Sequence, residues 1–537
     1  MFKLLTLSSV TLCSAILCAC GGSSSPTATV AASTAHGTLA VNPPFRIASL
    51  TAATLQSELA STSTGAGLLE VTGNPSCGVD FYYVKFWTLG GAEVPEVTES
   101  SGALMVPTGA APACSGPRPI VLYAHGTNTD KALNIADITN TSNSEGVLIA
   151  ATFAARGYIV VAPNYAGYDI STLGYHPYLN AVQQSGEMID ILTAARAALP
   201  KTLSAATSDS GKLFVTGYSQ GGYVAMATQR ALEASGAVVT GAAPASGPYA
   251  LEAFGDAILF GNVDLGSTVF TPLLTTSYQK AYGNIYNTPS DVYSSTYVNG
   301  IETLLPSTTP IDSIFASNLL PETAEFDSTT PVVSIPGNPT LSAELTALLS
   351  VPGSATYPLP PTAQTPLFAL GFGSPYLVND SYRASYALDA AGNPDGAVPT
   401  PRAGVPLAAT APVQPFRLAF YKNDLRNGAW SPNSPTLLCG GDQDPTVFYS
   451  VNTATMAAFW SPLVQAGLIT VLDVGGTPAG PFAEVQTGFQ ASQAQAYAAL
   501  ISGGASPAAA AQTLVQNYHT SVAPFCMVAA RGFFSEL

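Results

Sequence analysis

The chain has 537 residues, of which 9% are charged and 47% are hydrophobic. A chain with this apolar content is not intrinsically disordered and can bury a large core. Its 33 acidic residues outnumber its 17 basic residues, which gives a formal charge of -16. Because such a chain repels phosphates and has no stripe of Lys and Arg, we expect no nucleic-acid partner.

The N-terminus has the layout of an export signal. A cationic start at Lys3 precedes an apolar run that ends in small residues, so residues 1–19 are predicted to be a signal peptide. The cleavage region, Leu17-Cys18-Ala19-Cys20-Gly21, resembles a bacterial lipobox, in which the last cysteine is lipidated. We expect lipidation at Cys20 and a flexible tether over residues 20–45; an ordinary signal peptide with incidental cysteines is the alternative.

This N-terminus predicts an exported protein, either anchored in the outer membrane by its lipid or extracellular. Elsewhere no apolar run reaches the roughly 20 residues that a membrane-spanning helix needs. We therefore expect contact with a membrane only through the lipid anchor.

Four cysteines follow the N-terminal segment: Cys77, Cys114, Cys439 and Cys526. An even number in an exported chain favours two disulfides, for which three pairings are possible, over four free thiols. We favour Cys77–Cys114, which would join the two ends of an N-terminal hairpin region. We also favour Cys439–Cys526, for a reason that depends on the site described below.

Short apolar strands alternate with helices over residues 46–250. Two antiparallel strands are predicted first, at Asp80–Trp87 and Ala103–Val106. Continuously apolar strands at residues 120–124, 158–162, 213–216 and 238–242 then alternate with helices at about 147–156, 181–199 and 220–234. This pattern predicts an α/β fold with a mostly parallel sheet covered by helices on both faces.

The alternation stops near residue 251 and returns near residue 431. Residues 251–430 are rich in Pro, Thr and Ser, with short helical pieces. A loop of this length is rare inside a compact domain, so we interpret the segment as a cap or lid. Residues 431–537 then complete the domain. We expect the apolar residues 258–260 and 269–274 either to line a pocket or to form the core of the insertion.

One motif carries nucleophilic chemistry. The strand at 213–216 leads into Gly217-Tyr218-Ser219-Gln220-Gly221-Gly222, and a helix follows. A G-x-S-x-G sequence in this setting indicates a turn that is too tight for side chains at the glycines and that exposes the serine hydroxyl. The backbone N–H of Gln220 would lie at a helix start, where it can face a developing negative charge. The alternative is a glycine-rich turn with an idle serine.

A serine hydroxyl needs a base to become a nucleophile, and the chain has only four histidines. His36 lies in the expected tether, and His125 and His176 precede the serine. Enzymes with this strand–serine–helix turn carry nucleophile, acid and base in that order along the chain. His519 is therefore the predicted base.

The acid is expected on the loop after the strand near residue 436, where it can hold the other imidazole nitrogen. Asp444 has the G-x-x-D-x-x-V spacing common at this place, and Asp442 is the fallback. Cys439 ends that strand, and Cys526 lies seven residues after His519. A disulfide between them would clamp the acid and base segments together, which is why we favour this pairing.

The loop that follows the strand at 120–124 reads His125-Gly126-Thr127-Asn128. A second N–H that binds the oxyanion comes from this loop in such enzymes, and we assign it to Thr127. We expect His125 to hold the loop by hydrogen bonds. The histidines are too scattered for a metal site and no phosphate or dinucleotide motif is present, so we expect no metal and no cofactor.

These segments together resemble the secreted lipases and esterases of the α/β-hydrolase superfamily that plant-pathogenic bacteria use on plant cell walls. The matching segments are 123–127, 162–168, 174–178, 217–222, 246–251, 423–425 and 439–447. The resemblance covers about residues 75–250 and 415–535 and is weak in the insertion. It implies an α/β-hydrolase fold and hydrolysis of carboxylic esters by Ser219, His519 and Asp444, with a small-molecule, lipid or polymeric ester as substrate.

Two other functions remain open from the sequence. A serine peptidase can use the same three residues, and peptidases often grip a substrate amine with acidic groups in the cap. Glu322, Glu325 and Asp327 lie together in the insertion, but their directions do not follow from sequence. A non-catalytic surface lipoprotein is the third reading, and the complete set of three residues argues against it.

Overall fold

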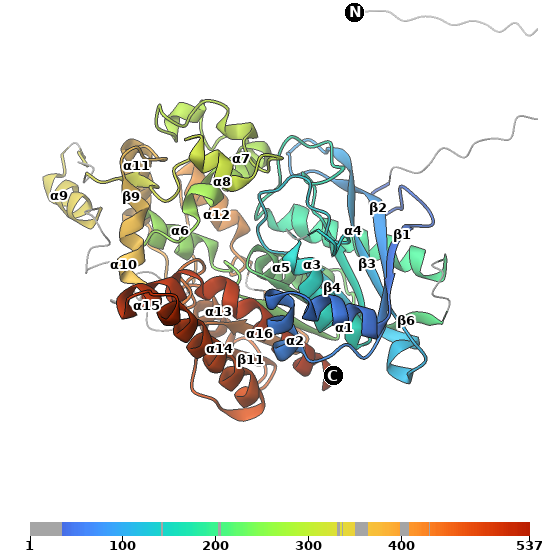
Figure 1. Cartoon of the computed structure of the whole chain (residues 1–537). Helices are drawn as coiled ribbons and strands as arrows, with labels where there is room; N and C mark the ends of the chain where they lie inside the picture. Colours follow the sequence, from blue (N-terminus) through green and yellow to red (C-terminus); the bar gives the residue numbers. More distant parts are fainter. Residues whose placement is uncertain are drawn as a thin grey trace, which may run out of the picture. The chain divides into compact units, whose positions relative to one another are not determined.

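A central sheet runs through the part of the chain that the computed structural model describes, which is residues 35–537 except 141–142, 202–205, 330–332, 336, 350–363, 398–406 and 429. Among these residues nine strands form this sheet, in the order β1-β2-β3-β5-β4-β6-β7-β10-β11 (Figure 1). Their bounds are β1 Phe45–Leu50, β2 Gly78–Leu89, β3 Val97–Thr108, β4 Gly116–Ala124, β5 Ile159–Pro163, β6 Thr207–Tyr218, β7 Gly241–Ala245, β10 Thr436–Gly440 and β11 Ile469–Asp473.

The pairing is antiparallel at one edge and parallel elsewhere. β1, β2, β3 and β5 pair antiparallel, whereas β5, β4, β6, β7, β10 and β11 pair parallel. Because the carboxyl ends of parallel strands meet at one edge, the loops after β4, β6 and β10 converge there. The predicted nucleophile, oxyanion loop and acid lie on these three loops.

Helices cover both faces of the sheet, which is why its strands are apolar on both sides. Along β2, Val79 and Phe81 join the core on one face, and Tyr82 and Val84 join the core on the other. The helices of the sheet domain are α1 Ala52–Ala60, α2 Ser63–Thr72, α3 Ser144–Thr152, α4 Ala181–Ala198, α5 Gln220–Ala234, α13 Thr453–Trp460, α14 Ala483–Ser502, α15 Pro507–Gln516 and α16 Tyr518–Ser535. This architecture confirms the expected α/β class.

The predicted elements before the insertion lie close to their expected positions, with one difference. β7 begins at Gly241, three residues later than expected, because Val238 is exposed and β7 pairs with β6 from Gly241 onward and with β10 from Ala242 onward. After the insertion, the last helix, α16, begins at Tyr518, so His519 lies in its first turn.

Residues 37–40, which the sequence assigns to the tether, run beside β2. The N–H of Gly37 donates to the carbonyl of Trp87, and that of Ala40 donates to the carbonyl of Lys85, both at 2.8 Å. His36 Nδ1 lies 2.8 Å from Asp190 Oδ1 of α4. This segment pairs with the end of β2 that β1 does not cover, because β1 pairs with β2 only as far as Tyr83. The signal peptide expected at 1–19 and the lipidation site expected at Cys20 lie outside the described residues.

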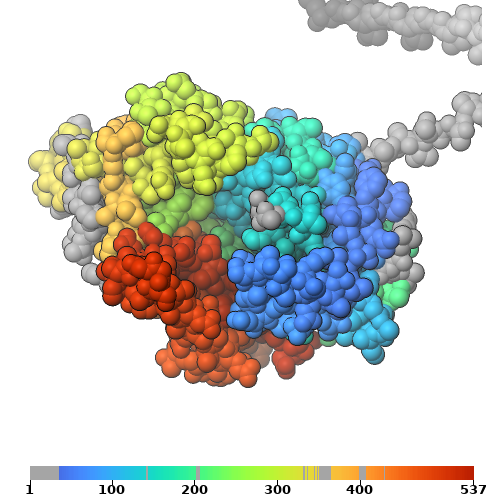
Figure 2. Space-filling model, in the orientation of Figure 1, coloured from blue at the N-terminus to red at the C-terminus, as the bar shows by residue number. Residues whose placement is uncertain are grey.

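The regular structure of the insertion between β7 and β10 consists mainly of helices in its described residues (Figure 1). In Figure 2 the insertion, coloured from green to orange, lies on one side of the molecule. It holds α6 Leu251–Leu259, α7 Ser267–Tyr282, α8 Ile311–Ala316, α9 Pro339–Leu348, α10 Thr365–Phe368, α11 Asp380–Gly392 and α12 Pro415–Asn423, with the short strands β8 Phe326–Asp327 and β9 Phe372–Gly373. The sequence indicated only short helical pieces here, because its Pro, Thr and Ser content hides the helices that tertiary packing stabilises.

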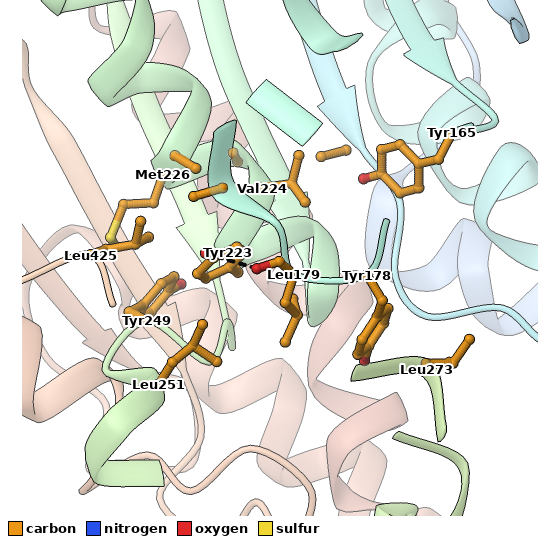
Figure 3. Close-up of a cluster of buried hydrophobic side chains, with 14 of the residues drawn as sticks. Tyr165, Tyr178, Leu179, Tyr223, Val224, Met226, Tyr249, Leu251, Leu273 and Leu425 are labelled. Atoms are coloured by element: carbon orange, nitrogen blue, oxygen red, sulfur yellow. Dashed lines mark hydrogen bonds between the residues drawn. The ribbon is translucent and has the colours of Figure 1, made fainter. Parts of the chain in front are cut away.

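The insertion packs on α4, α5 and their connecting loops. Figure 3 shows one part of this core, in which Leu179 and Tyr223 of the sheet domain are drawn with Leu251, Leu273 and Leu425 of the insertion. The Tyr223 hydroxyl donates to the carbonyl of Asn423 at the end of α12 at 2.7 Å. The insertion and the sheet domain therefore share one hydrophobic core.

Two buried arginines strengthen the insertion. Arg417 of α12 makes a bidentate contact of 2.8 Å with Asp256 of α6. Arg426 contacts Asp395 and Asp424, each at 2.7 Å, and the side chains of all three are fully buried. Such pairs hold segments in register, because separating them strands a charge in an apolar interior.

Among the described residues, no helix is both long and apolar enough to cross a membrane.

Replacing Arg426 with Met leaves two buried carboxylates without their cation. We expect the free energy of unfolding to fall by about 3–5 kcal/mol in urea titrations. The matched control is Arg196→Met, because Arg196 pairs with Asp209 in a partly exposed position, where such a pair contributes less than about 1 kcal/mol. Equal losses in the two variants would contradict a stabilising role for the buried cluster.

Candidate active site

Ser219 lies in a strained turn between β6 and α5. Its backbone has φ 59° and ψ -124°, a region that residues with a side chain rarely adopt. Its N–H donates to the carbonyl of Ala245 at 3.0 Å, which joins the turn to β7. The side chain is thereby held at the carboxyl edge of the sheet, as the motif predicted.

The glycines around Ser219 are required by close contacts. A Cβ on Gly221 would lie 1.9 Å from the carbonyl oxygen of Ala124, and one on Gly217 would lie 2.3 Å from that of Gly221. Larger residues would push α5 away from β4. The motif is thus explained by backbone-to-backbone packing.

His519 and Asp444 form a buried pair beside this turn. His519 Nδ1 lies 2.6 Å from Asp444 Oδ2. The other carboxylate oxygen of Asp444 accepts from the backbone N–H groups of Thr446 and Val447, each at 2.9 Å. Asp444 is only 1% exposed, so its carboxylate is held in place on both sides.

Asp442, the fallback acid, lies elsewhere. It is exposed and accepts from the hydroxyl of Tyr518 at 3.2 Å. The geometry therefore brings Asp444, and not Asp442, to the imidazole.

The imidazole of His519 packs on Tyr218, the residue before the serine. Their ring centroids lie 5.0 Å apart, and the Tyr218 hydroxyl donates to the carbonyl of His519. His519 Nε2 is buried and has no hydrogen-bond partner among the described residues, and Ser219 Oγ makes no hydrogen bond to it. Such contacts are often loose without substrate and tighten when it binds.

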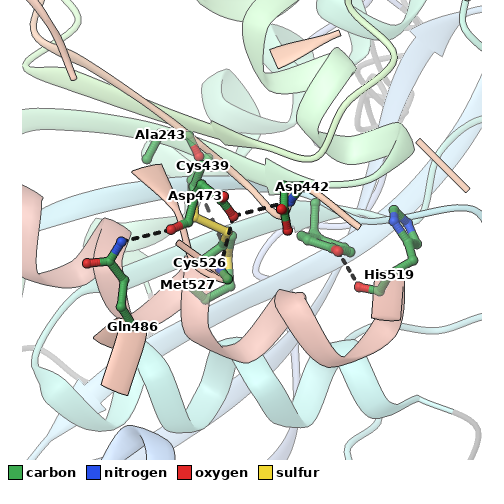
Figure 4. The surroundings of a disulfide bond; sticks show 11 residues. Ala243, Cys439, Asp442, Asp473, Gln486, His519, Cys526 and Met527 are labelled. Carbon is green, nitrogen blue, oxygen red and sulfur yellow. Dashed lines mark hydrogen bonds between the residues drawn. A yellow bond between two sulfur atoms is a disulfide. The ribbon is translucent and has the colours of Figure 1, made fainter. Parts of the chain in front are cut away.

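Both expected disulfides are present. Cys439 and Cys526 are joined, with their Cα atoms 5.7 Å apart, and Cys77 is joined to Cys114. Figure 4 shows the first bond between the end of β10 and α16, with His519 two turns away on the same helix. This bond ties the segment that bears the acid to the helix that bears the base.

The backbone N–H groups of Gln220 and Thr127 have no protein partner among the described residues. The N–H of Gly126 is already occupied, because it donates to both oxygens of Glu145 at 2.9 and 3.0 Å. A Cβ on Gly126 would lie 3.6 Å from Ser219 Cβ, which shows that this loop borders the serine. The N–H of Thr127 is therefore free for the role expected from the sequence, as is that of its neighbour Asn128.

His125 and His176 are buried and hold the loops around the serine. His125 Nδ1 lies 2.7 Å from the carbonyl of Gly126, as expected for a residue that fixes the loop. Burial lowers the pKa of His125 to about 4 and that of His176 to about 3, so both rings are neutral at pH 7.

The contact between His176 and Gln220 was not predicted from the sequence. His176 Nδ1 donates to the carbonyl of Ala166 at 2.9 Å, and its Nε2 lies 2.7 Å from the side-chain amide of Gln220. A neutral ring with this donor accepts at Nε2, so the amide donates to it. The histidine therefore holds the side chain of Gln220, the residue next to Ser219. No local pattern signals a contact between residues 44 positions apart.

An apolar pocket opens beside Ser219 and Gln220, with about 620 Å³ of empty space when its mouth is included. Most of its wall comes from the insertion, namely Leu251, Phe254, Ile258, Leu259, Phe270, Thr271, Leu274, Phe416 and Phe420. Members of both apolar clusters noted in the sequence are among them.

In the described residues no group of three His, Cys, Asp or Glu side chains is placed to hold a metal ion.

The model of the prolyl oligopeptidase family, Peptidase_S9, matches residues 146–246, a segment that includes Ser219. No curated protein matches the chain.

Several solved structures are similar over most of their length. The rice cell wall degrading esterase LipA from Xanthomonas oryzae has 24% identity and a TM-score of 0.58, covering 82% of this chain and 91% of that one. A ligand-bound form of that esterase has 24% identity and a TM-score of 0.62, with 93% and 98% covered. A proposed hydrolase from Legionella pneumophila has 17% identity and a TM-score of 0.53, with 92% and 96% covered. The chain thus has the expected α/β-hydrolase fold.

The neutral state of His176 gives a pH dependence that can be measured. Its pKa is about 3 in the folded protein and near 6.5 when unfolded. Between about pH 3 and pH 6.5 the histidine therefore takes up a proton when the protein unfolds. The stability that comes from burying the neutral ring is lost as the pH falls below about 6.5. In His176→Gln we expect the free energy of unfolding to depend less steeply on pH, by about 1.4 kcal/mol per pH unit between 6 and 4.5. If the free energy of unfolding from urea titrations changed equally with pH in the parent and in His176→Gln, His176 would not be buried in the neutral state.

Proposed function

We propose that this α/β-hydrolase-fold protein is a serine hydrolase that cleaves carboxylic esters through an acyl-enzyme. The observation that carries the proposal is the strained strand–helix turn at Ser219 beside the buried His519–Asp444 pair. A serine held in this way, next to an oriented imidazole, has what nucleophilic catalysis of acyl transfer requires.

In the proposed acylation, Ser219 Oγ attacks the ester carbonyl carbon while His519 Nε2 takes the hydroxyl proton. Asp444 holds Nδ1–H, which fixes the tautomer and stabilises the imidazolium. The tetrahedral intermediate then expels the alcohol, which receives the proton from His519. In deacylation, water attacks the acyl-enzyme with the same base, the acid is released and Ser219 recovers its proton.

The negative charge on the carbonyl oxygen would be bound by the backbone N–H groups of Gln220 and Thr127. Their lack of protein partners supports this role, since preorganised donors lower the barrier without reorganising. The contact between His176 and the Gln220 side chain would keep one donor in position.

An ester substrate is favoured by the lining of the pocket, which suits an acyl chain or another apolar group. The similarity to an esterase that degrades rice cell walls is consistent with a lipid or polymeric ester. A serine peptidase is the second candidate, favoured by the family match over residues 146–246. The strained backbone at Ser219 and the hydrogen-bonded His519–Asp444 pair argue against a non-catalytic lipoprotein, in which nothing would offset the cost of the strain.

We also propose that the protein works outside the cytoplasm, anchored by a lipid on Cys20 or released. The two disulfides support an oxidising compartment. Both the anchor and the signal peptide rest on the sequence of residues 1–20.

Ser219→Ala should lower kcat/KM for short p-nitrophenyl esters by at least about a thousandfold, because no other group can form the acyl-enzyme. The matched control is Ser277→Ala, another buried serine, whose hydroxyl has no partner and does not line the pocket. An active Ser219→Ala enzyme would disprove the proposed nucleophile. Cleavage of peptides alone by the parent enzyme would establish the peptidase alternative.

Asp444→Asn should lower kcat about a thousandfold or more, because an amide favours the wrong tautomer of His519. Asp442→Asn should retain activity within a few fold, since its carboxylate contacts Tyr518 instead. Steady-state kinetics of both variants on one ester test the choice of acid, and a larger loss in Asp442→Asn would reverse it.

A further inference from the structure

One carboxyl group in the wall of the pocket has no explanation in the proposed reaction. Asp264, in the loop between α6 and α7, lines the pocket together with Ser219 and Gln220. It is 3% exposed, and neither of its carboxylate oxygens has a hydrogen-bond partner among the described residues. A buried polar group normally has hydrogen-bond partners. Two carboxylate oxygens without a partner in a pocket wall therefore point to a hydrogen-bond donor on a bound ligand.

The loop is held in place beside the proposed acid. The N–H of Leu265 donates to the carbonyl of Pro445 at 3.0 Å, next to Asp444 in the chain. The backbone next to Asp264 is therefore anchored to the segment that bears Asp444. The side chain of Asp264 is buried in the pocket wall.

A second acid lies behind the same wall. Glu325, 2% exposed, accepts from the hydroxyl of Thr271 at 2.6 Å, and Thr271 itself lines the pocket. The other oxygen of Glu325 has no partner. Burial raises the pKa of Asp264 well above its usual range, Glu325 and Asp444 raise it further, and the backbone N–H of Asp264 itself lowers it. The two charged side chains that act on Asp264 in this way are both acids.

No cation compensates this group. Among the described residues, Asp264 and Glu325 form no ion pair with Lys, Arg or His. The other buried acids of the insertion differ, since Asp256 and Asp395 are each paired with an arginine. The pocket thus combines apolar walls with one acidic position that a positively charged N–H donor would satisfy best.

We propose that Asp264 forms a subsite for an ammonium group, so that the preferred substrates carry a positively charged amine on the chain that enters the pocket. This inference rests on the proposed ester hydrolysis and narrows its substrate class. The ammonium donates to Asp264, and the apolar part of the chain contacts the phenylalanines and leucines that line the same pocket.

The test compares ethyl esters of hexanoic, 6-aminohexanoic and 6-hydroxyhexanoic acids at pH 7, with the ethanol released as the readout. A second series carries the same end groups on the alcohol side. We expect kcat/KM to be about tenfold higher for an amino ester than for its unsubstituted parent in at least one series. In Asp264→Asn, which keeps the shape but cannot form a carboxylate beside the ammonium, the ratio should fall close to one while the parent ester is still hydrolysed.

The matched control is Asp312→Asn, which removes an exposed acid of the same insertion and should leave the ratio unchanged. Three results would overturn the subsite: equal rates for amino and unsubstituted esters, a preference for the hydroxy ester over the amino ester, or a preference that survives Asp264→Asn.

Binding of n-hexylammonium separates this inference from the proposed reaction. Calorimetric titration of Ser219→Ala should show binding about tenfold tighter than to the double variant that also carries Asp264→Asn. If no ester is hydrolysed but this difference is found, the subsite stands and the proposed reaction fails. If esters are hydrolysed and hexylammonium binds both proteins equally, the proposed reaction stands and the subsite fails.

Discussion

The close approach of β6, α5 and β4 is the constraint on which the rest of the site depends. Because the backbone of Gly221 nearly touches the carbonyl of Ala124, the turn between strand and helix must be tight. That turn holds Ser219 in its unusual backbone conformation and places it in the pocket wall at the sheet edge. The same contact brings the loop after β4 beside the serine, so one packing requirement places both the proposed nucleophile and the residues proposed to bind the oxyanion.

A second set of constraints positions the base. His519 lies in the first turn of α16, and the Cys439–Cys526 disulfide joins that helix to β10. Asp444 follows β10 and is held by two backbone N–H groups. The imidazole is thus fixed from the helix, from the acid and from the ring of Tyr218. A geometry that acyl transfer tolerates only within narrow limits is supported by covalent and buried contacts.

The insertion contributes the substrate side of the site. Its helices α6, α7 and α12 line the pocket, and arginines buried within it neutralise most of its internal acids. Asp264 is an exception, and it lies in the pocket wall. An acid that the protein leaves unpaired costs stability, and the proposed ammonium subsite accounts for that cost. Under this proposal the insertion, more than the sheet domain, would select the substrate.

The sequence by itself predicted the α/β class, the glycine turn around Ser219 and His519 as the base among four histidines, and it favoured the two disulfide pairings that the structure contains. These follow from local periodicity, from motif spacing and from the small number of candidate residues. Only the tertiary structure decided between Asp444 and Asp442, joined His176 to Gln220, made the insertion helical and showed Asp264 without a partner. Those features are contacts between residues far apart in the chain, and side-chain direction and burial are set by packing that no local pattern records.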